Sequence, residues 1–227
     1  MGSRKVLIDI SRRPVYLIHM QISTKKKRGR PPSSGISHSL TRKRLIECAT
    51  AIFTEKGFSR TGIDEILKQV NVPKGSFYHF FKSKEDFGVA VIDNYANYFG
   101  NKLDRFFNDE GLTPLARLNA FIENAKLGME KYHYARGCLI GNLGQELSQL
   151  DDPFRHQIES VFLDWEKRLC QLFKHAQRAE EVATDIDCAD LASYFWIGWE
   201  GAVLRAKLVK NKKPLQTFQQ QFFARLH

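Results

Sequence analysis

Beyond its first fifth, the chain carries apolar residues at the spacing of an α-helix, and this pattern most constrains its fold. Leu45, Ala49, Ile52 and Phe53 recur at helical spacing, and Gly57 is expected to end that helix. No alternating run of apolar and polar residues predicts a strand, and no internal repeat of roughly 20–50 residues is present. The sequence therefore predicts an all-α protein.

Capping signals and prolines divide this region into about nine helices. Thr61 with Asp64, and Ser83 with Asp86, have the spacing of a capping box in which Asp replaces Glu. The expected helices cover residues 39–57, 61–70, a short stretch from about 74, 84–108, 113–132, 137–149, 153–176, 188–210 and 215–226.

The second and third of these helices are short and are joined by a tight turn, Asn71-Val72-Pro73. Two short helices after a longer one are the parts of a helix-turn-helix, whose second helix enters the DNA major groove. The residues expected to contact DNA include base readers, phosphate contacts and an apolar anchor: Lys74, Gly75 and Ser76 for bases, Thr61, Tyr78, His79 and Lys84 for phosphates, and Phe77 as the anchor. The alternative is an ordinary helical hairpin with a basic loop.

At these positions the sequence resembles the TetR family of transcriptional regulators. The matching residues fall where the helix-turn-helix signature of that family has them: Phe53, Gly57, Thr61, Ile63, Ile66, Val70, Val72, Lys74, Gly75, Tyr78, Phe80, Phe81, Lys84, Glu85 and Phe87. Pro73 stands where the family often has Ser. The signature covers residues 39–99.

Three further segments, 72–79, 136–139 and 195–202, look like those of TetR members that respond to unsaturated electrophiles, the acrylate-responsive and N-ethylmaleimide-responsive repressors. The resemblance implies a homodimer that binds double-stranded operator DNA and a small-molecule effector. It also implies a DNA-binding domain over 39–99, with the helix-turn-helix at about 62–81, followed by a regulatory and dimerisation domain over 100–227. Faces of 153–176 and 188–210 are expected to pack against their copies in a second subunit.

Charge separates the N-terminal segment from the rest of the chain. Residues 1–44 hold twelve Lys and Arg and one acid, a net charge of +11, whereas the remaining residues sum to −1. Residues 1–38 are therefore expected to be a largely disordered basic arm that meets nucleic acid or an anionic membrane surface, or serves only as a solvated tail. Its segment Arg28-Gly29-Arg30-Pro31 resembles an AT-hook core, in which Arg28 and Arg30 would enter the minor groove; the alternative is a nonspecific phosphate-binding tail.

Cys138 is the candidate sensor. It follows Arg136 and Gly137 at an expected helix start, where the helix N-terminus and a cation would lower the thiol pKa. In the electrophile-responsive members that the chain resembles, a matching Cys is implicated in sensing. Arg136 could instead bind the carboxylate of an acrylate-like acid. The alternative is that Cys138 is a small buried apolar residue.

Trp196 and Trp199 could line an effector pocket, with Glu200 as a polar contact. A Trp-rich face at helical spacing is also typical of a core or of a dimer interface.

Several classes of protein are not supported by the sequence. Cys138 and His133 lack a residue to orient a catalytic base, and no phosphate-binding glycine loop, HExxH or GxSxG is present, so no enzyme is expected. The four cysteines form no CxxC pair and no His has ligand spacing near a Cys, so neither a metal nor another cofactor is expected.

The longest uncharged apolar run, Leu191–Trp199, has nine residues, whereas a membrane-spanning helix needs about 20. No signal-peptide core is present, so a cytoplasmic protein is expected.

The sequence thus predicts a DNA-binding transcriptional regulator, a repressor released by a small electrophile or an unsaturated acid. The alternative function is a helical dimerisation protein whose basic arm binds nucleic acid or anionic membrane nonspecifically. The operator, the target genes, the natural effector and the choice between repressor and activator stay open, as does the translation of residues 1–19, because Met20 could also start the chain.

Overall fold

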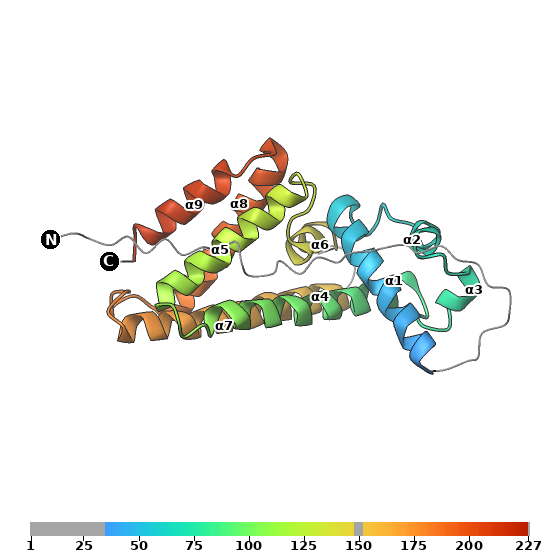
Figure 1. Ribbon diagram of the computed structural model, residues 1–227, viewed down its shortest axis with the longest axis horizontal. Coiled ribbons are helices and arrows are strands. Elements are labelled where there is room, and N and C mark those ends of the chain that lie inside the picture. The colour runs from blue at the N-terminus through green and yellow to red at the C-terminus, as the bar shows by residue number, and fades with distance from the viewer. Residues whose placement is uncertain (1–34, 148–151, 227) are drawn as a thin grey trace. The chain divides into compact units, whose positions relative to one another are not determined.

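The computed structural model describes residues 35–147 and 152–226, and within these ranges the chain forms helices and no strand (Figure 1). The helices are α1 (Gly35–Lys56), α2 (Ile63–Val70), α3 (Lys74–Phe77), α4 (Lys84–Phe107), α5 (Pro114–Lys131), α6 (Leu139–Leu147), α7 (Asp152–Arg178), α8 (Cys188–Val209) and α9 (Lys213–Phe223). The predicted all-α fold is confirmed. None of these helices is long and apolar enough to cross a membrane.

The N-terminal boundary of α1 differs from the expected one. The helix begins at Gly35, four residues before Ser39. The predicted minor-groove residues Arg28 and Arg30 lie outside the described residues.

One of the two expected capping boxes forms and the other does not. Ser83 is the N-cap of α4, and its hydroxyl accepts a hydrogen bond from the backbone N–H of Asp86 at 3.1 Å. The capping box expected at Thr61 is wrong, because Gly62 is the N-cap of α2 and makes no side-chain cap. The Thr61 hydroxyl instead donates to the carbonyl oxygen of Gly57 at 2.7 Å.

The turn between α2 and α3 depends on Asn71. Its φ of 55° lies in the left-handed region, which Asn tolerates better than most residues. The N–H of Val72 then donates to the carbonyl oxygen of Leu67 at 3.0 Å and closes the end of α2. Pro73 follows as the residue before α3, where its fixed φ suits the entry into a helix.

Phenylalanine rings fill the space among α1, α3 and α4. Phe87 on α4 is fully buried, with its ring centroid 5.3 Å from that of Phe77 and 4.5 Å from that of Phe81. Phe53 on α1 meets Phe87 at 6.1 Å and Phe58 at 5.2 Å. These contacts fix the short helix α3 against the longer helices, because a helix of four residues has little stability of its own.

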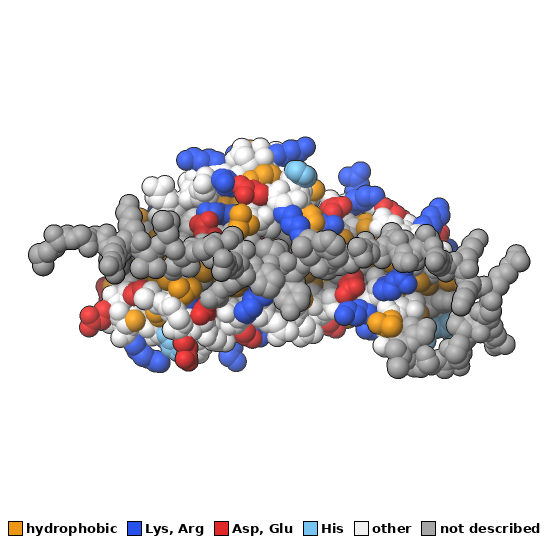
Figure 2. Space-filling model, viewed as in Figure 1, with side chains coloured by type: hydrophobic (Ala, Val, Ile, Leu, Met, Phe, Trp, Pro, Cys, Tyr) orange, Lys and Arg blue, Asp and Glu red, His pale blue; other side chains and the backbone are white. Residues whose placement is uncertain are grey.

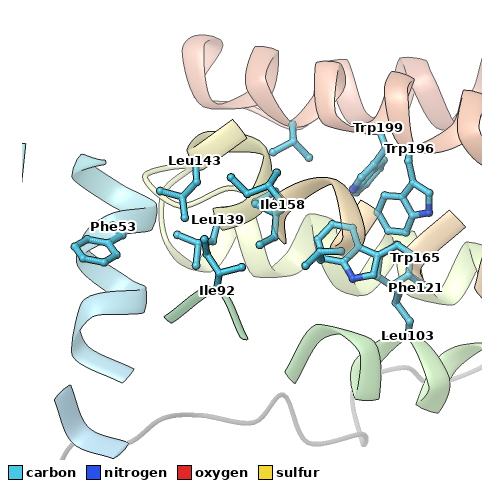
Figure 3. Close-up of a cluster of buried hydrophobic side chains, with 14 of the residues drawn as sticks. Phe53, Ile92, Leu103, Phe121, Leu139, Leu143, Ile158, Trp165, Trp196 and Trp199 are labelled. Atoms are coloured by element: carbon cyan, nitrogen blue, oxygen red, sulfur yellow. The ribbon is translucent and has the colours of Figure 1, made fainter. Parts of the chain in front are cut away.

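The remaining helices form a bundle in which α7 packs against both α4 and α8, and α9 packs against α8. Its centre is a cluster of aromatic rings (Figure 3). Phe99 lies 4.4 Å from Trp165 between ring centroids, and Trp165 lies 5.1 Å from Trp196. The same core continues through Ile92 and Leu143 to Phe53 on α1, so apolar packing joins the bundle to the first helix.

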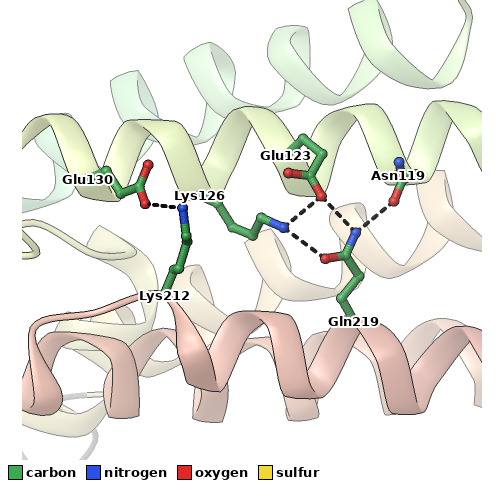
Figure 4. Close-up of polar contacts among 6 residues, drawn as sticks. All are labelled: Asn119, Glu123, Lys126, Glu130, Lys212 and Gln219. Carbon is green, nitrogen blue, oxygen red and sulfur yellow. Dashed lines mark hydrogen bonds and ion pairs between the residues drawn. The ribbon is translucent and has the colours of Figure 1, made fainter. Parts of the chain in front are cut away.

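A line of polar residues joins α5 to α9 (Figure 4). Lys126 is buried, and its ammonium donates to Glu123 at 2.6 Å and to the Gln219 carbonyl oxygen at 2.9 Å. One turn further along α5, Glu130 pairs with Lys212 at 2.8 Å. Because a buried ammonium without these partners would be costly, the network fixes the register of α9 on α5.

Candidate functional site

The N-terminus of α3 presents a small polar surface. Lys74 and Gly75 are exposed and Ser76 is half-buried, as a base-reading helix requires. The Lys74 ammonium pairs with Asp64 at 3.1 Å, but both side chains are about 60% exposed, so the pair is weak and can be exchanged for DNA. Tyr78 and His79 are exposed directly after the helix, whereas Phe77 is fully buried and holds α3 from behind.

The two remaining predicted phosphate contacts are placed differently. Thr61 is 1% exposed, and its hydroxyl is already bonded to Gly57, so a phosphate contact by its side chain does not fit this structure. Lys84 is half-buried, lies 4.5 Å from the centre of the Phe58 ring and donates to the Ser59 carbonyl oxygen at 3.4 Å. Burial lowers the pKa of the Lys84 ammonium.

The start of α1, for which no sequence motif predicts a role, lies beside the segment that follows α3. The His38 ring centroid is 4.2 Å from that of Phe80, and the Arg42 guanidinium carbon is 5.2 Å from the centre of the Phe81 ring. Arg42 and Lys43 are exposed. On the face shown in Figure 2, basic and acidic side chains are interspersed over the described residues.

Cys138 immediately precedes α6, as expected, and its sulfur accepts a hydrogen bond from the Gly141 N–H at 3.4 Å. The expected low pKa is wrong. The residue is 8% exposed, and burial, followed by the charge of Glu200, raises the pKa of the thiol well above its usual range. The expected partner Arg136 turns away, since it pairs with Glu55 at 2.6 Å and lies 4.0 Å from the centre of the Tyr132 ring.

Glu200 of α8 is the acidic partner of the thiol. Its carboxyl group lies against Gly141, which also contacts the Cys138 side chain, and burial raises the pKa of Glu200 to about 7. Lys207, two turns further along α8, is the cation whose charge acts on both groups, and burial lowers its own pKa. The buried phenol of Tyr95 on α4 also faces Cys138 and Glu200, and burial raises the Tyr95 pKa.

The Lys207 ammonium donates to the Asn142 side-chain oxygen at 3.2 Å. We refer to Tyr95, Cys138, Asn142, Glu200 and Lys207 as the sensing cluster.

Asn142 also belongs to a second set of contacts, which holds the end of α1. Its amide nitrogen donates to the Thr54 carbonyl oxygen at 2.9 Å. Glu146, one turn later on the same face of α6, accepts hydrogen bonds from the backbone N–H groups of Phe58 at 2.8 Å and Ser59 at 2.6 Å. We call Asn142 and Glu146 the α6 clasp. The Glu146 carboxylate lies against Gly57, whose φ of 90° strains any other residue type.

Trp196 and Trp199 are 2% and 3% exposed and belong to the aromatic core of the bundle (Figure 3). Trp199 stacks on Phe195 with 6.0 Å between ring centroids. The structure therefore describes both tryptophans as core residues, and a role in lining an effector pocket stays a prediction.

One face of α8 exposes large apolar side chains. Tyr194, Ile197, Leu204 and Leu208 are 45%, 72%, 38% and 68% exposed, and they follow one another at intervals of one or two helical turns. The exposed Gly201 lies in the same stripe, with open space where a side chain would begin. Leu163 on α7 is 54% exposed as well.

Two sequence-family models match the chain. The model described as "Bacterial regulatory proteins, tetR family" covers residues 45–91, and "Tetracyclin repressor-like, C-terminal domain" covers residues 114–222. The chain is similar to the transcriptional regulator AcuR of Cereibacter sphaeroides, with 48% identity over 88% of this chain and 91% of AcuR. It is also 32% identical to the repressor DhaR of Mycobacterium sp., over 78% of this chain and 87% of DhaR.

Solved structures share the fold. A regulatory protein TetR from Rhodobacter sphaeroides is 48% identical, with a TM-score of 0.81. The match covers 83% of this chain and all of that chain. The reduced form of Escherichia coli NemR has a TM-score of 0.74 over 82% of this chain and 97% of its own, at 24% identity, which supports the fold alone. Regulators of this type bind operator DNA and act as dimers. On this evidence the chain belongs to the TetR family of bacterial transcriptional regulators, and it is a DNA-binding regulator of transcription.

Proposed function

We propose that the protein is a homodimeric repressor that binds its operator through α3 and leaves it when a small electrophile or an unsaturated acid acts on the sensing cluster. The observation that carries the proposal is the pair of bonds made by Asn142. Its amide group joins Lys207 of the cluster to the Thr54 carbonyl at the end of α1. DhaR, which is 32% identical, is named a transcriptional repressor and supports this direction of regulation.

The proposed domains follow those expected from the sequence, with the first boundary moved to the start of α1: a basic arm over 1–34, a DNA-binding domain over 35–99 and a regulatory domain over 100–227. Operator binding places the repressor where bacterial DNA is, in the cytoplasm. The nonspecific interaction protein considered as an alternative function does not account for a helix-turn-helix with an exposed polar helix start at Lys74.

For DNA recognition, Lys74 is the residue to test. Replacing Lys74 with Ala removes an exposed ammonium from the N-terminus of α3, so we expect a loss of about 1–3 kcal/mol on the preferred operator and a relaxed base preference at one position. Fluorescence anisotropy on the operator and on single-base variants measures both. Lys131→Ala, an exposed change on α5, serves as the control and should leave binding unchanged. A uniform loss on all sequences would show that Lys74 contacts only phosphate.

The second subunit is proposed to cover the apolar stripe of α8. A stripe with this spacing suits an antiparallel or crossed helix pair, and Gly201 lets two helices approach closely. The exposed Leu163 of α7 continues the same kind of surface.

Ile197→Glu places a charge on this stripe, so we expect a monomer at micromolar concentration and the loss of tight operator binding. Light scattering measures the mass. Leu127→Glu, on the half-exposed apolar residue of α5, is the matched control and should remain a dimer. A dimeric Ile197→Glu protein would show that the subunits meet elsewhere.

Release is proposed to start at the sulfur of Cys138. The thiol is buried, so an adduct cannot fit without moving the side chains of Glu200 or Lys207. Moving Lys207 breaks its bond to Asn142 and so changes the contact with α1. To turn a population from 1:99 to 99:1 an effector must favour one conformation by roughly 5.5 kcal/mol, which a covalent bond supplies more readily than a small acid does.

A polar groove of about 310 Å³ between α4 and α7 is less suited to an unsaturated acid. Asp93 and Asp164 line it, and the Arg168 side chain there is already bonded to Asp164 and Asp104. A carboxylate would therefore meet negative charge without a free cation to hold it.

Cys138→Ser tests the covalent route. The variant should bind the operator like the original protein and should no longer release it when treated with N-ethylmaleimide, as followed by gel shift. Cys170→Ser, at the half-buried cysteine of α7, should still be released. Release of the Cys138→Ser protein by N-ethylmaleimide would disprove the covalent route, and release of both proteins by acrylate alone would favour reversible binding.

Asn142→Ala tests the connection to α1. It removes the bonds to Lys207 and Thr54 while Glu146 still holds Phe58 and Ser59, so we expect operator binding to remain and the extent of release at saturating modification to fall. Gln145→Ala, an exposed change on the same helix, is the control. Full release of Asn142→Ala after complete modification of Cys138 would rule out this route of coupling.

A further inference from the structure

We infer that Glu200 is the proton acceptor that makes Cys138 reactive toward α,β-unsaturated carbonyl compounds. The inference rests on the proposed function, because it concerns the chemistry of the same sensing cluster. It assigns to Glu200 a direct part in the addition reaction rather than a structural one.

The position of the Glu200 carboxyl group is fixed by its neighbours. It lies so close to the Cα of Gly141 that a methyl group there would overlap it, and the Cβ of Cys138 lies 3.8 Å from the position of that methyl group. The same residue, Gly141, donates its N–H to the Cys138 sulfur at 3.4 Å. The sulfur therefore has a carboxyl group to receive its proton and a backbone donor to stabilise the negative charge that develops.

A local base is needed because a neutral thiol is a poor nucleophile. Cys138 is buried and its pKa is raised well above the usual range, so the thiolate is scarce at neutral pH. Of the other groups that face it, Tyr95 on α4 is a phenol with a raised pKa and Asn142 on α6 is an uncharged amide, so neither accepts the proton. The amine of Lys207 on α8 is directed to the Asn142 side-chain oxygen, to which it donates at 3.2 Å.

The proposed step is an addition without oxidation. The sulfur of Cys138 attacks the β-carbon of the unsaturated compound, a carbon–sulfur bond forms, and the carbon–carbon π bond opens to an enolate. The thiol proton passes to the Glu200 carboxylate and then to the α-carbon, which restores the carboxylate. The net change is the addition of the S–H group across the double bond.

The carboxylate must be ionised to act, and this fixes the pH dependence. The pKa of Glu200 is raised to about 7 by burial, so its ionised fraction grows as the pH rises through that value. The rate of modification of Cys138 should therefore rise with pH, with a midpoint near 7, and then level off. Tyr95, which faces the same groups, stays a neutral phenol through this range because its pKa is raised, and burial lowers the pKa of Lys207, which faces them from α8.

Glu200→Gln distinguishes a base from a spectator, because the two roles predict opposite signs. The charge of Glu200 raises the pKa of the thiol, so removing a spectator carboxylate would make Cys138 more acidic and faster to react. Removing the base should instead slow the reaction at least tenfold at pH 7.5 and abolish the midpoint near 7. The probe is N-ethylmaleimide, and mass spectrometry of the peptide that contains Cys138 gives the rate at that residue alone.

Three comparisons complete the experiment. Asp190→Asn, an exposed acid on the same helix, should leave the rate and its pH profile unchanged. Circular dichroism and operator affinity report whether Glu200→Gln folds. If it does not fold, Glu200→Asp decides: a slower reaction that keeps a carboxylate midpoint supports the base, and an equal or faster one overturns it.

Operator release is measured separately in the same samples. A rate that depends on Glu200 without release would support the proton transfer and contradict the proposed function. Release with an equal or faster rate in Glu200→Gln would leave the proposed function standing and disprove the role of Glu200.

Discussion

The hydrogen bonds between α6 and the end of α1 are the contact on which the proposed regulation depends. The Glu146 carboxylate satisfies the backbone N–H groups of Phe58 and Ser59, which α1 and α2 leave without helical partners, and Asn142 satisfies the carbonyl of Thr54. Buried backbone groups are costly to leave unpaired, so the DNA-binding domain cannot change its position relative to α6 without exchanging these bonds. Through the clasp, the orientation of α3 depends on the position of α6 in the bundle.

Burial sets the chemistry of the sensing cluster. At the surface, a cysteine at a helix N-terminus beside a cation would be an acidic thiol, but here desolvation raises the pKa of Cys138 and of Glu200 together. A buried neutral thiol is protected from nonspecific oxidation or alkylation. The neighbouring Glu200 carboxylate is the base proposed to activate it. Lys207 joins this pair to the clasp, because its side chain faces Cys138 and Glu200 and also donates to the Asn142 side-chain oxygen.

The fold could be predicted from the sequence largely because local signals agree with it. Ser83, which caps the start of α4, and the left-handed Asn71, which ends α2, act as residue chemistry dictates. The capping box predicted at Thr61 is wrong because a threonine hydroxyl can bond either to the preceding turn or to the following helix. Here it donates to the Gly57 carbonyl oxygen in the preceding turn. Likewise the helix start at Cys138 was predictable, whereas its burial and its partner Glu200, far along the chain, depend on how α6 and α8 meet.

The same long-range contacts explain why Arg136 was assigned the wrong role. Arg136 lies only two residues before Cys138 in the sequence. Its flexible side chain instead pairs with the Glu55 carboxylate and lies over the Tyr132 ring. It thus becomes a third link between the loop before α6 and the end of α1. Since Arg136, Asn142 and Glu146 all reach that end from one short segment, a disturbance at Cys138, which lies within the segment, reaches all of them at once. Cys138, the proposed sensor, lies one helical turn before Asn142 and two turns before Glu146, so it shares one short segment with the clasp.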